Sequence, residues 1–222
     1  MLHKTCQLKK IYSTLYEAFG PQHWWPGDTP FEIMVGAILT QNTNWSNVEK
    51  AINNLKQARC LTPLSLKTIS QKRLAQLIKP SGYYNIKAKR LKSFINFLYQ
   101  EFSGRLNKMK KVPLAELREK FLSVNGIGPE TADSILLYAL GKPIFVVDAY
   151  TKRILFRHGF VEQGDDYHHV QQLFMKNWPA DMKVFNEFHA LLVNLGKHYC
   201  KPTPHCEQCP LKTKGFPVKN FV

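Results

Sequence analysis

Apolar residues recur along nearly the whole chain at a spacing close to 3.6, the period of a helix that buries one face. Residues 144–147 alone look like a strand, and a single stretch of four residues does not make a sheet. We therefore expect an all-α fold. The clearest helical stripes fall at 31–38, 48–55, 91–98, 114–124, 132–139, 170–174 and 184–195.

One break in this pattern is "VNGIGPETADSILLYAL", residues 124–140, where Gly126 and Gly128 flank Ile127. Glycine tolerates positive φ and lets a ligand approach the main chain closely. Pro129 suits the first position of a helix, and a helix N-terminus attracts anions through its unpaired N–H groups and its dipole. The stretch predicts either a phosphate-binding hairpin or an ordinary tight turn between two helices.

The charge of the chain favours a polyanionic partner. Lysine and arginine total 31 against 16 acidic residues, a formal net charge of +15, and such an excess is typical of nucleic-acid-binding proteins. No apolar run is long enough to cross a bilayer, and the N-terminus lacks the pattern of a signal peptide. We expect a cytoplasmic protein with no membrane partner. The chain has five cysteines, and this odd number argues against a disulfide framework.

A second motif, "IFVVDAYTKR", places Asp148 after an apolar run, where by itself it would be read as a helix N-cap. Together with "GIGPETAD", "VGAILTQNT", "SGYYNIKAKR" and the late cysteines, it resembles the helix-hairpin-helix DNA glycosylase superfamily, endonuclease III type. The resemblance covers nearly the whole chain. It implies two helical domains with a helix-hairpin-helix motif and a DNA-binding cleft between them. The central helical-barrel domain would span 30–140 with the hairpin at 125–129, and 1–29 plus 141–222 would form the other.

The resemblance implies that Asp148 is catalytic. Cleavage of an N-glycosidic bond builds positive charge on the sugar, and a nearby carboxylate stabilises that charge and helps water attack C1′. This chemistry needs no cofactor. The base must first leave the duplex stack, and Gln41 and Tyr83 match family positions that insert into DNA. Tyr83 is larger and more polar at its tip than the aliphatic residue often found there, and Gln41 could instead be a polar residue at a helix C-terminus.

Glu130 stands where bifunctional members of the family carry a lysine that attacks C1′. A Schiff base requires an amine, so the resemblance implies base removal without strand cleavage. We expect the Glu130 carboxylate to face the base pocket, although it also suits a helix N-terminus by charge.

Aromatic residues suggest which base is removed. Trp24, Trp25, Pro26 and Trp45 match the pocket of the 3-methyladenine DNA glycosylase branch. An alkylated purine such as 3-methyladenine is cationic, and a cation over an indole gains about 0.5–2 kcal/mol. The alternative is that these tryptophans only pack between the domains. For the DNA backbone, Lys87, Lys89 and Arg90 are candidate phosphate contacts, unless they form an ordinary solvated helix face.

The loop "YCKPTPHCEQCPLKTKGF" holds Cys200, Cys206 and Cys209. The family's iron–sulfur loop has a fourth cysteine, and Gly215 stands at that position here. A [4Fe-4S] cluster takes four thiolates, so the cluster would need an unusual fourth ligand such as His198 or His205. Zinc with three cysteines and one histidine, or a loop without metal, are the alternatives. Any metal would be structural.

The resemblance therefore implies a monomeric, nucleoid-associated DNA glycosylase that acts on double-stranded DNA containing a damaged base, most simply an alkylated purine. An endonuclease III-like or mismatch-specific enzyme acting on pyrimidines is the first alternative. A non-enzymatic helical DNA-binding module is the second, and Asp148 argues against it.

Overall fold

The computed structural model describes residues 2–24 and 27–219, and in this part of the chain it contains helices and no β-strand. The predicted all-α fold is confirmed there. The chain divides into two compact units, one made of residues 25–142 and the other of both chain ends, 1–24 and 143–222. We call them the central unit and the terminal unit. No helix in the described residues is both long and apolar enough to cross a membrane.

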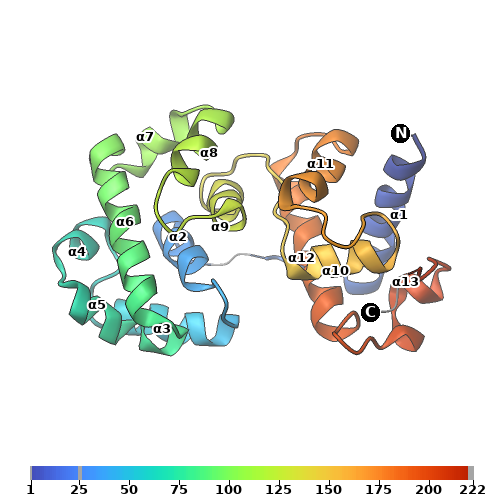
Figure 1. Ribbon diagram of the computed structural model, residues 1–222, viewed down its shortest axis with the longest axis horizontal. Coiled ribbons are helices and arrows are strands. Elements are labelled where there is room, and N and C mark those ends of the chain that lie inside the picture. Colours follow the sequence, from blue (N-terminus) through green and yellow to red (C-terminus); the bar gives the residue numbers. More distant parts are fainter. Residues whose placement is uncertain (1, 25–26, 220–222) are drawn as a thin grey trace. The chain divides into compact units, whose positions relative to one another are not determined.

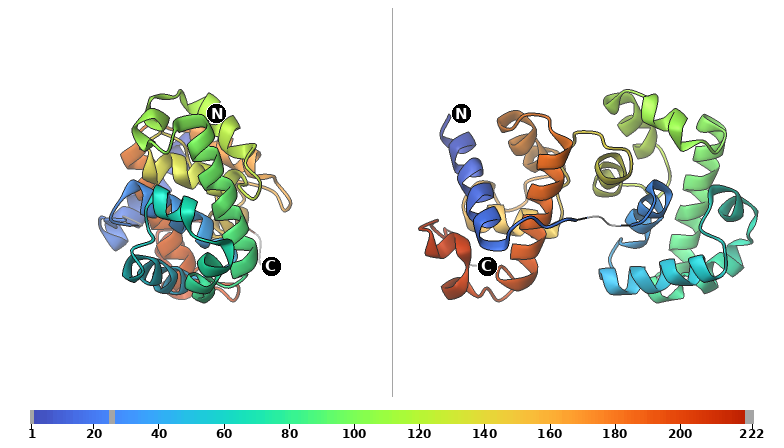
Figure 2. Two further views of the ribbon diagram at one scale, coloured as in Figure 1. Left: turned by 90° about the vertical axis from the view of Figure 1, so that its left-hand side faces the viewer. Right: turned by 180° about the vertical axis from the view of Figure 1, so that it is seen from behind.

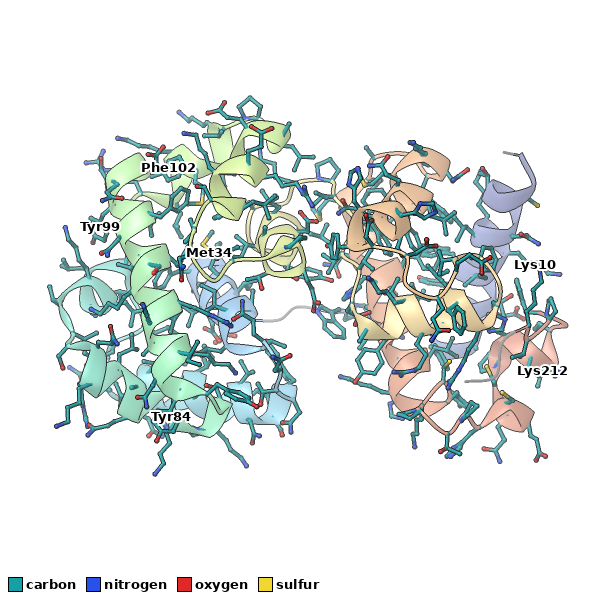
Figure 3. The ribbon with its side chains drawn as sticks, in the orientation of Figure 1. Lys10, Met34, Tyr84, Tyr99, Phe102 and Lys212 are labelled. Atoms are coloured by element: carbon teal, nitrogen blue, oxygen red, sulfur yellow. The ribbon has the colours of Figure 1, made fainter. Side chains whose placement is uncertain are left out.

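The central unit is organised around α6, its longest helix (Figure 1). Helices α2, α4, α5 and α7 pack against α6, and Figure 3 shows Tyr84 at one end of this helix and Tyr99 and Phe102 at the other. The core contains the rings of Phe94 and Phe121, whose centroids lie 6.5 Å apart. The elements of this unit are α2 (Pro30–Leu39), α3 (Trp45–Gln57), α4 (Pro63–Thr68), α5 (Gln71–Leu77), η1 (Lys79–Ser81), α6 (Tyr84–Phe102), α7 (Leu106–Lys111), α8 (Leu114–Leu122), α9 (Pro129–Ser134) and the π-helical η2 (Ile135–Ala139).

Side-chain caps define where several of these helices begin. The Thr29 hydroxyl accepts a hydrogen bond from the Glu32 N–H at 3.1 Å, and the Asn44 side chain caps α3 in the same way. Such caps satisfy N–H groups that the first helical turn leaves without a partner. The first of these caps precedes the apolar stripe at 31–38, and the second precedes that at 48–55.

The terminal unit packs α1 and α10 against α12, and Figures 1 and 2 show α1 beside α12 although the two come from opposite ends of the chain. The Phe145 ring stacks on that of Phe174 with centroids 3.6 Å apart. The buried stretch 144–147, which looks like a strand in the sequence, is extended chain that joins no sheet. It leads directly into Asp148. The elements of this unit are α1 (Leu2–Phe19), α10 (Ala149–Arg157), α11 (Tyr167–Asn177), α12 (Met182–His198), η3 (Cys206–Gln208) and α13 (Pro210–Thr213).

Candidate active site

Asp148 is the N-cap of α10 in the terminal unit. Its Oδ1 accepts a hydrogen bond from the Thr151 N–H at 2.7 Å, and its side chain is 14% exposed. Its Oδ2 lies 3.6 Å from Nε2 of His189, which comes from α12 and is buried. One carboxylate oxygen is therefore hydrogen-bonded at the start of α10, the other faces the His189 ring, and part of the side chain still reaches solvent.

The surroundings of Asp148 favour its ionised form. Burial by itself would raise the pKa of this carboxyl group, but the adjacent His189 imidazole, followed by the N–H of Thr151, lowers it below its ordinary value. Asp148 is thus an anion at neutral pH, as stabilisation of a sugar cation requires. His189 was not singled out in the sequence. Its only signal there is a polar residue beside Phe188 on the apolar face of a predicted helix.

Trp24 joins this cluster from the other side of His189. The two rings meet edge to face, with centroids 6.1 Å apart. Asn186 donates to the Trp24 carbonyl at 3.4 Å, and Nζ of Lys197 lies 5.6 Å from the centre of the indole. The indole Nε1 is buried and has no hydrogen-bond partner among the described residues. Of the predicted pocket residues, Trp24 therefore lies near Asp148, while Trp25 and Pro26 fall outside the described residues.

The glycine hairpin connects α8 to α9 in the central unit. Gly126 has φ +87°, in the region that favours glycine, and Ile127 is buried. Gly128 is the N-cap of α9 with φ −92° and ψ 178°, and no atom lies within 4 Å of where its Cβ would be. The space beside Gly128, at the start of α9, is therefore open.

Gln41 is bonded to this hairpin. Its Nε2 donates to the Gly126 carbonyl and to Oγ1 of Thr131, both at 2.9 Å, and its Oε1 accepts from Nη1 of Arg90. The predicted insertion of Gln41 into DNA would require these three bonds to break. Arg90, predicted to contact phosphate, is thereby linked to the hairpin turn.

Tyr83 stands on an exposed turn before α6. It has φ +43°, a left-handed conformation that is rare for a residue with a bulky side chain, and it is 69% exposed. Such a ring is available for stacking, and the insertion role of Tyr83 stays a prediction.

The prediction that Lys87 contacts DNA phosphate disagrees with the structure. Lys87 is only 1% exposed, and its ammonium donates to two main-chain carbonyls, so it cannot reach a phosphate without unfolding its surroundings. Its neighbour Lys89 is exposed and remains a candidate phosphate contact.

Two other predicted pocket residues lie in the central unit. Glu130 is exposed in the first turn of α9, where an acidic side chain suits the helix dipole. Trp45 is half-buried, its ring faces Gly36, and its Nε1 donates to Glu49 at 2.8 Å. The contacts of Trp45 are those of a packing residue, and its pocket role stays a prediction.

The late cysteines line one small cavity of about 10 Å³ together with Arg157 and His158. Nη1 of Arg157 donates to Sγ of Cys200 at 3.3 Å, and burial raises the pKa of the Cys209 thiol. The guanidinium of Arg157 also donates to the carbonyls of Lys201 and Pro202, at 2.6 and 2.7 Å.

This donor set does not fit an ordinary four-iron cluster, because such a cluster takes four thiolates and only three cysteines line the cavity. His198 and His205, the candidate fourth ligands, are exposed and do not line the cavity. Within residues 2–24 and 27–219, no group of three or more His, Cys, Asp or Glu side chains is arranged to hold a metal ion. The loop is anchored by the hydrogen bonds of Arg157 and by Nε of Arg153, which donates to the Cys200 carbonyl at 2.7 Å.

A model of the HhH-GPD superfamily of base excision DNA repair proteins matches residues 35–180, which include the hairpin and Asp148. The chain belongs to this superfamily. The resemblance to the helix-hairpin-helix DNA glycosylases is thereby confirmed, and we describe the chain as a DNA repair glycosylase of the HhH-GPD superfamily.

Three relatives illustrate this membership of the HhH-GPD superfamily. The Methanocaldococcus jannaschii protein named "Putative DNA repair glycosylase MJ1434" is 46% identical over 205 residues, 91% of this chain and 93% of that protein. The H. pylori 3-methyladenine DNA glycosylase MagIII, bound to 1,N6-ethenoadenine, is 31% identical with a TM-score of 0.74, covering 87% of this chain and 97% of its own. A trapped endonuclease III–DNA covalent intermediate has a TM-score of 0.80 over 93% of both chains, and at 24% identity it shows the shared fold.

Proposed function

We propose that this HhH-GPD protein is a monofunctional DNA glycosylase that hydrolyses the N-glycosidic bond of a damaged base, specifically an alkylated purine such as 3-methyladenine. The observation that carries the proposal is the cluster of Trp24, His189 and Asp148, which places an ionised, partly exposed carboxylate near an indole ring.

Asp148 supplies the electrostatics of the proposed reaction. As the base leaves, positive charge develops on the sugar, and a fixed carboxylate stabilises it without having to reorganise. The Thr151 N–H and His189 hold the carboxylate in one orientation, so that it also serves to align the attacking water.

The preference for a purine is supported by Trp24, whose ring offers a stacking surface beside Asp148, and by the 31% identity with the 3-methyladenine glycosylase MagIII. Absence of lyase activity is supported by Glu130, since the family resemblance implies that a lysine at this position would be the nucleophile.

One observation favours a second candidate, a bifunctional enzyme. Nζ of Lys197 lies 5.6 Å from the centre of the Trp24 ring, so an amine is present at this cluster. A lysine that reached C1′ there would form a Schiff base and open the way to strand cleavage.

The test is a panel of duplexes that each carry one defined lesion, incubated with excess enzyme and analysed with and without alkali. We expect a strand break at an alkylated purine only after alkali, and no covalent product with borohydride. Asp148→Asn should keep the fold, because asparagine also caps helices, and should lower the rate of base release by about 10²-fold or more. Release of a pyrimidine lesion instead would reject the substrate class, and a variant with nearly the wild-type rate would reject Asp148 as the catalytic residue.

Borohydride trapping separates the two candidates. If the wild type is trapped on damaged DNA and Lys197→Met is not, Lys197 is the nucleophile and the enzyme is bifunctional. If neither is trapped while both release the base, the monofunctional assignment holds.

A further inference from the structure

Lys87 is a buried cation on α6 whose ammonium is fully occupied by the main chain. It is 1% exposed, and its Nζ donates to the carbonyl oxygens of Leu39 at 2.8 Å and of Ser81 at 2.6 Å. Figure 3 labels Tyr84, the first residue of this helix, and Lys87 follows within the first turn.

Burying an ammonium is costly unless it is well hydrogen-bonded. Burial, together with the nearby Arg90, lowers the pKa of Lys87 to about 8. A residue that only filled space here would be better replaced by an apolar one. The position of the two acceptors therefore indicates what the lysine does.

Each acceptor belongs to a turn that carries a predicted DNA-inserting residue. Leu39 is the last residue of α2, and its carbonyl precedes Gln41 by two residues. Ser81 ends η1, and its carbonyl precedes Tyr83 by two residues. The Lys87 nitrogen therefore links the two turns. In each turn, the carbonyl that it binds lies two residues before the predicted inserting residue.

Both turns need such support. The Leu39 carbonyl lies in the last turn of α2, where carbonyls lack helical partners and attract cations. On the other side, Gly82 and Tyr83 both have positive φ, 67° and 43°, which is strained for tyrosine. The Lys87 N–H also donates to the Tyr83 carbonyl at 3.0 Å, so the same residue holds the turn through its backbone.

We propose that Lys87 is a positioning residue that fixes the Gln41 turn and the Tyr83 turn relative to each other, so that both turns meet one DNA lesion together and Gln41 has only its own side-chain bonds to release. The inference rests on the proposed function for its DNA-binding consequence, while the tie between the turns is a property of the free protein.

Lys92 on the same helix provides a matched control. Its Nζ donates to the carbonyls of Leu66 at 2.8 Å and Lys67 at 3.0 Å and also to that of Ile69, and burial lowers its pKa. It binds carbonyls as Lys87 does, but at the end of α4 and away from both inserting turns.

The experiment compares the wild type with Lys87→Met and Lys92→Met, which keep the stem and remove the donors. Hydrogen–deuterium exchange on the free protein reports the order of each turn. In parallel, a duplex with a tetrahydrofuran abasic analogue opposite 2-aminopurine reports insertion, because unstacking raises the fluorescence of 2-aminopurine. Should Lys87→Met fail to fold, Lys87→Gln takes its place, because its shorter, neutral side chain eases burial and cannot make both bonds of the Lys87 ammonium.

We expect Lys87→Met to speed exchange at residues 39–43 and 81–84 together by roughly 10-fold or more, from the loss of hydrogen bonds to a charged group. At saturating protein, the fluorescence rise should be largely lost, while affinity for undamaged duplex and its salt dependence stay as in the wild type. Lys92→Met should change exchange at 66–69 only and leave the fluorescence intact.

Three results would overturn the proposal: unchanged exchange at either turn, an undiminished fluorescence rise, or a salt slope reduced by about one unit, which would mark Lys87 as a phosphate contact. If the wild type itself gives no fluorescence rise and no preference for the abasic duplex, the proposed function fails. The exchange measurement then still decides whether Lys87 ties the turns.

Discussion

The two glycines of the hairpin should respond in opposite ways to the same substitution. Gly126 has φ +87°, and an added Cβ would collide with Cγ and Cδ of Arg90. Gly128 has φ −92°, a conformation open to any residue, and no atom lies within 4 Å of its Cβ position. Gly126→Ala therefore tests whether the turn needs glycine for stability, and Gly128→Ala tests whether a DNA phosphate approaches the turn.

The magnitudes follow from these surroundings. Left-handed backbone costs an L-residue about 1–2 kcal/mol. Arg90 cannot move aside freely because its guanidinium is bonded to Gln41, which is itself bonded to the Gly126 carbonyl. We expect Gly126→Ala to lower the free energy of unfolding by about 2–3 kcal/mol, within the range of strained backbone substitutions.

Gly128→Ala should leave stability within about 1 kcal/mol of the wild type or raise it, since it restricts the unfolded chain. Its methyl group would occupy the space through which a phosphate reaches the N–H groups of α9. Loss of one hydrogen bond to a charged group costs about 1.5–3 kcal/mol, so DNA affinity should fall roughly 10- to 100-fold.

The assays are urea unfolding for stability and fluorescence anisotropy with an abasic duplex, at one fixed salt concentration, for affinity. If Gly128→Ala binds DNA as well as the wild type does, the hairpin is not a phosphate site and is an ordinary turn. If Gly126→Ala is as stable as the wild type, the argument from φ and the Arg90 contact is wrong.

His189→Gln should raise the pKa of Asp148 by removing the imidazole that lowers it, and so move the acid limb of the single-turnover base-release rate to higher pH. The exposed His169→Gln is the control, and a pH profile that is only scaled would contradict the pairing of His189 with Asp148. The pKa of Lys87 in the folded protein, about 8, lies below that of an unfolded lysine, so the unfolded state binds more protons and the free energy of unfolding should rise between about pH 8 and 10 in the wild type. Lys87→Met should lack this rise, and equal slopes in urea unfolding across that range would refute the argument. Glu130→Lys, exposed in the first turn of α9, should become trappable on damaged DNA by borohydride, whereas trapping of the unmodified protein would mean that another amine is the nucleophile.

Helix content was predictable because it depends on local periodicity, and the stripe at 91–98 lies within α6 as expected. Lys87 shows where this reasoning was incomplete. Its charge indicated a DNA contact, yet it lies four residues before Leu91 and seven before Phe94, on the buried face of the same helix. The helical period places Lys87 on the buried face, whereas the two carbonyls that bind its ammonium, those of Leu39 and Ser81, lie outside α6 and cannot be read from that period.

At the candidate active site, the helix-capping position of Asp148 could be predicted because a cap is local in sequence, while its catalytic role is what the family resemblance implies and stays a prediction. His189 could not, because its distance from Asp148 is set by the packing of α12 against α10. The bonds of Gln41 to the hairpin were missed for the same reason: their partners are far away in the chain, and no local pattern encodes such a contact.

The division of the chain into a continuous central unit and a terminal unit built from both ends has a consequence for biosynthesis. Domains generally fold as units while the chain emerges from the ribosome. Residues 25–142 can fold as soon as they have emerged, whereas α1, made first, must wait for α12, its partner from the other end of the chain. During that interval the apolar face of α1, with Leu8, Ile11 and Leu15, is uncovered and accessible to chaperones. The nascent chain therefore carries an exposed apolar helix on the N-terminal side of a central unit that has already folded.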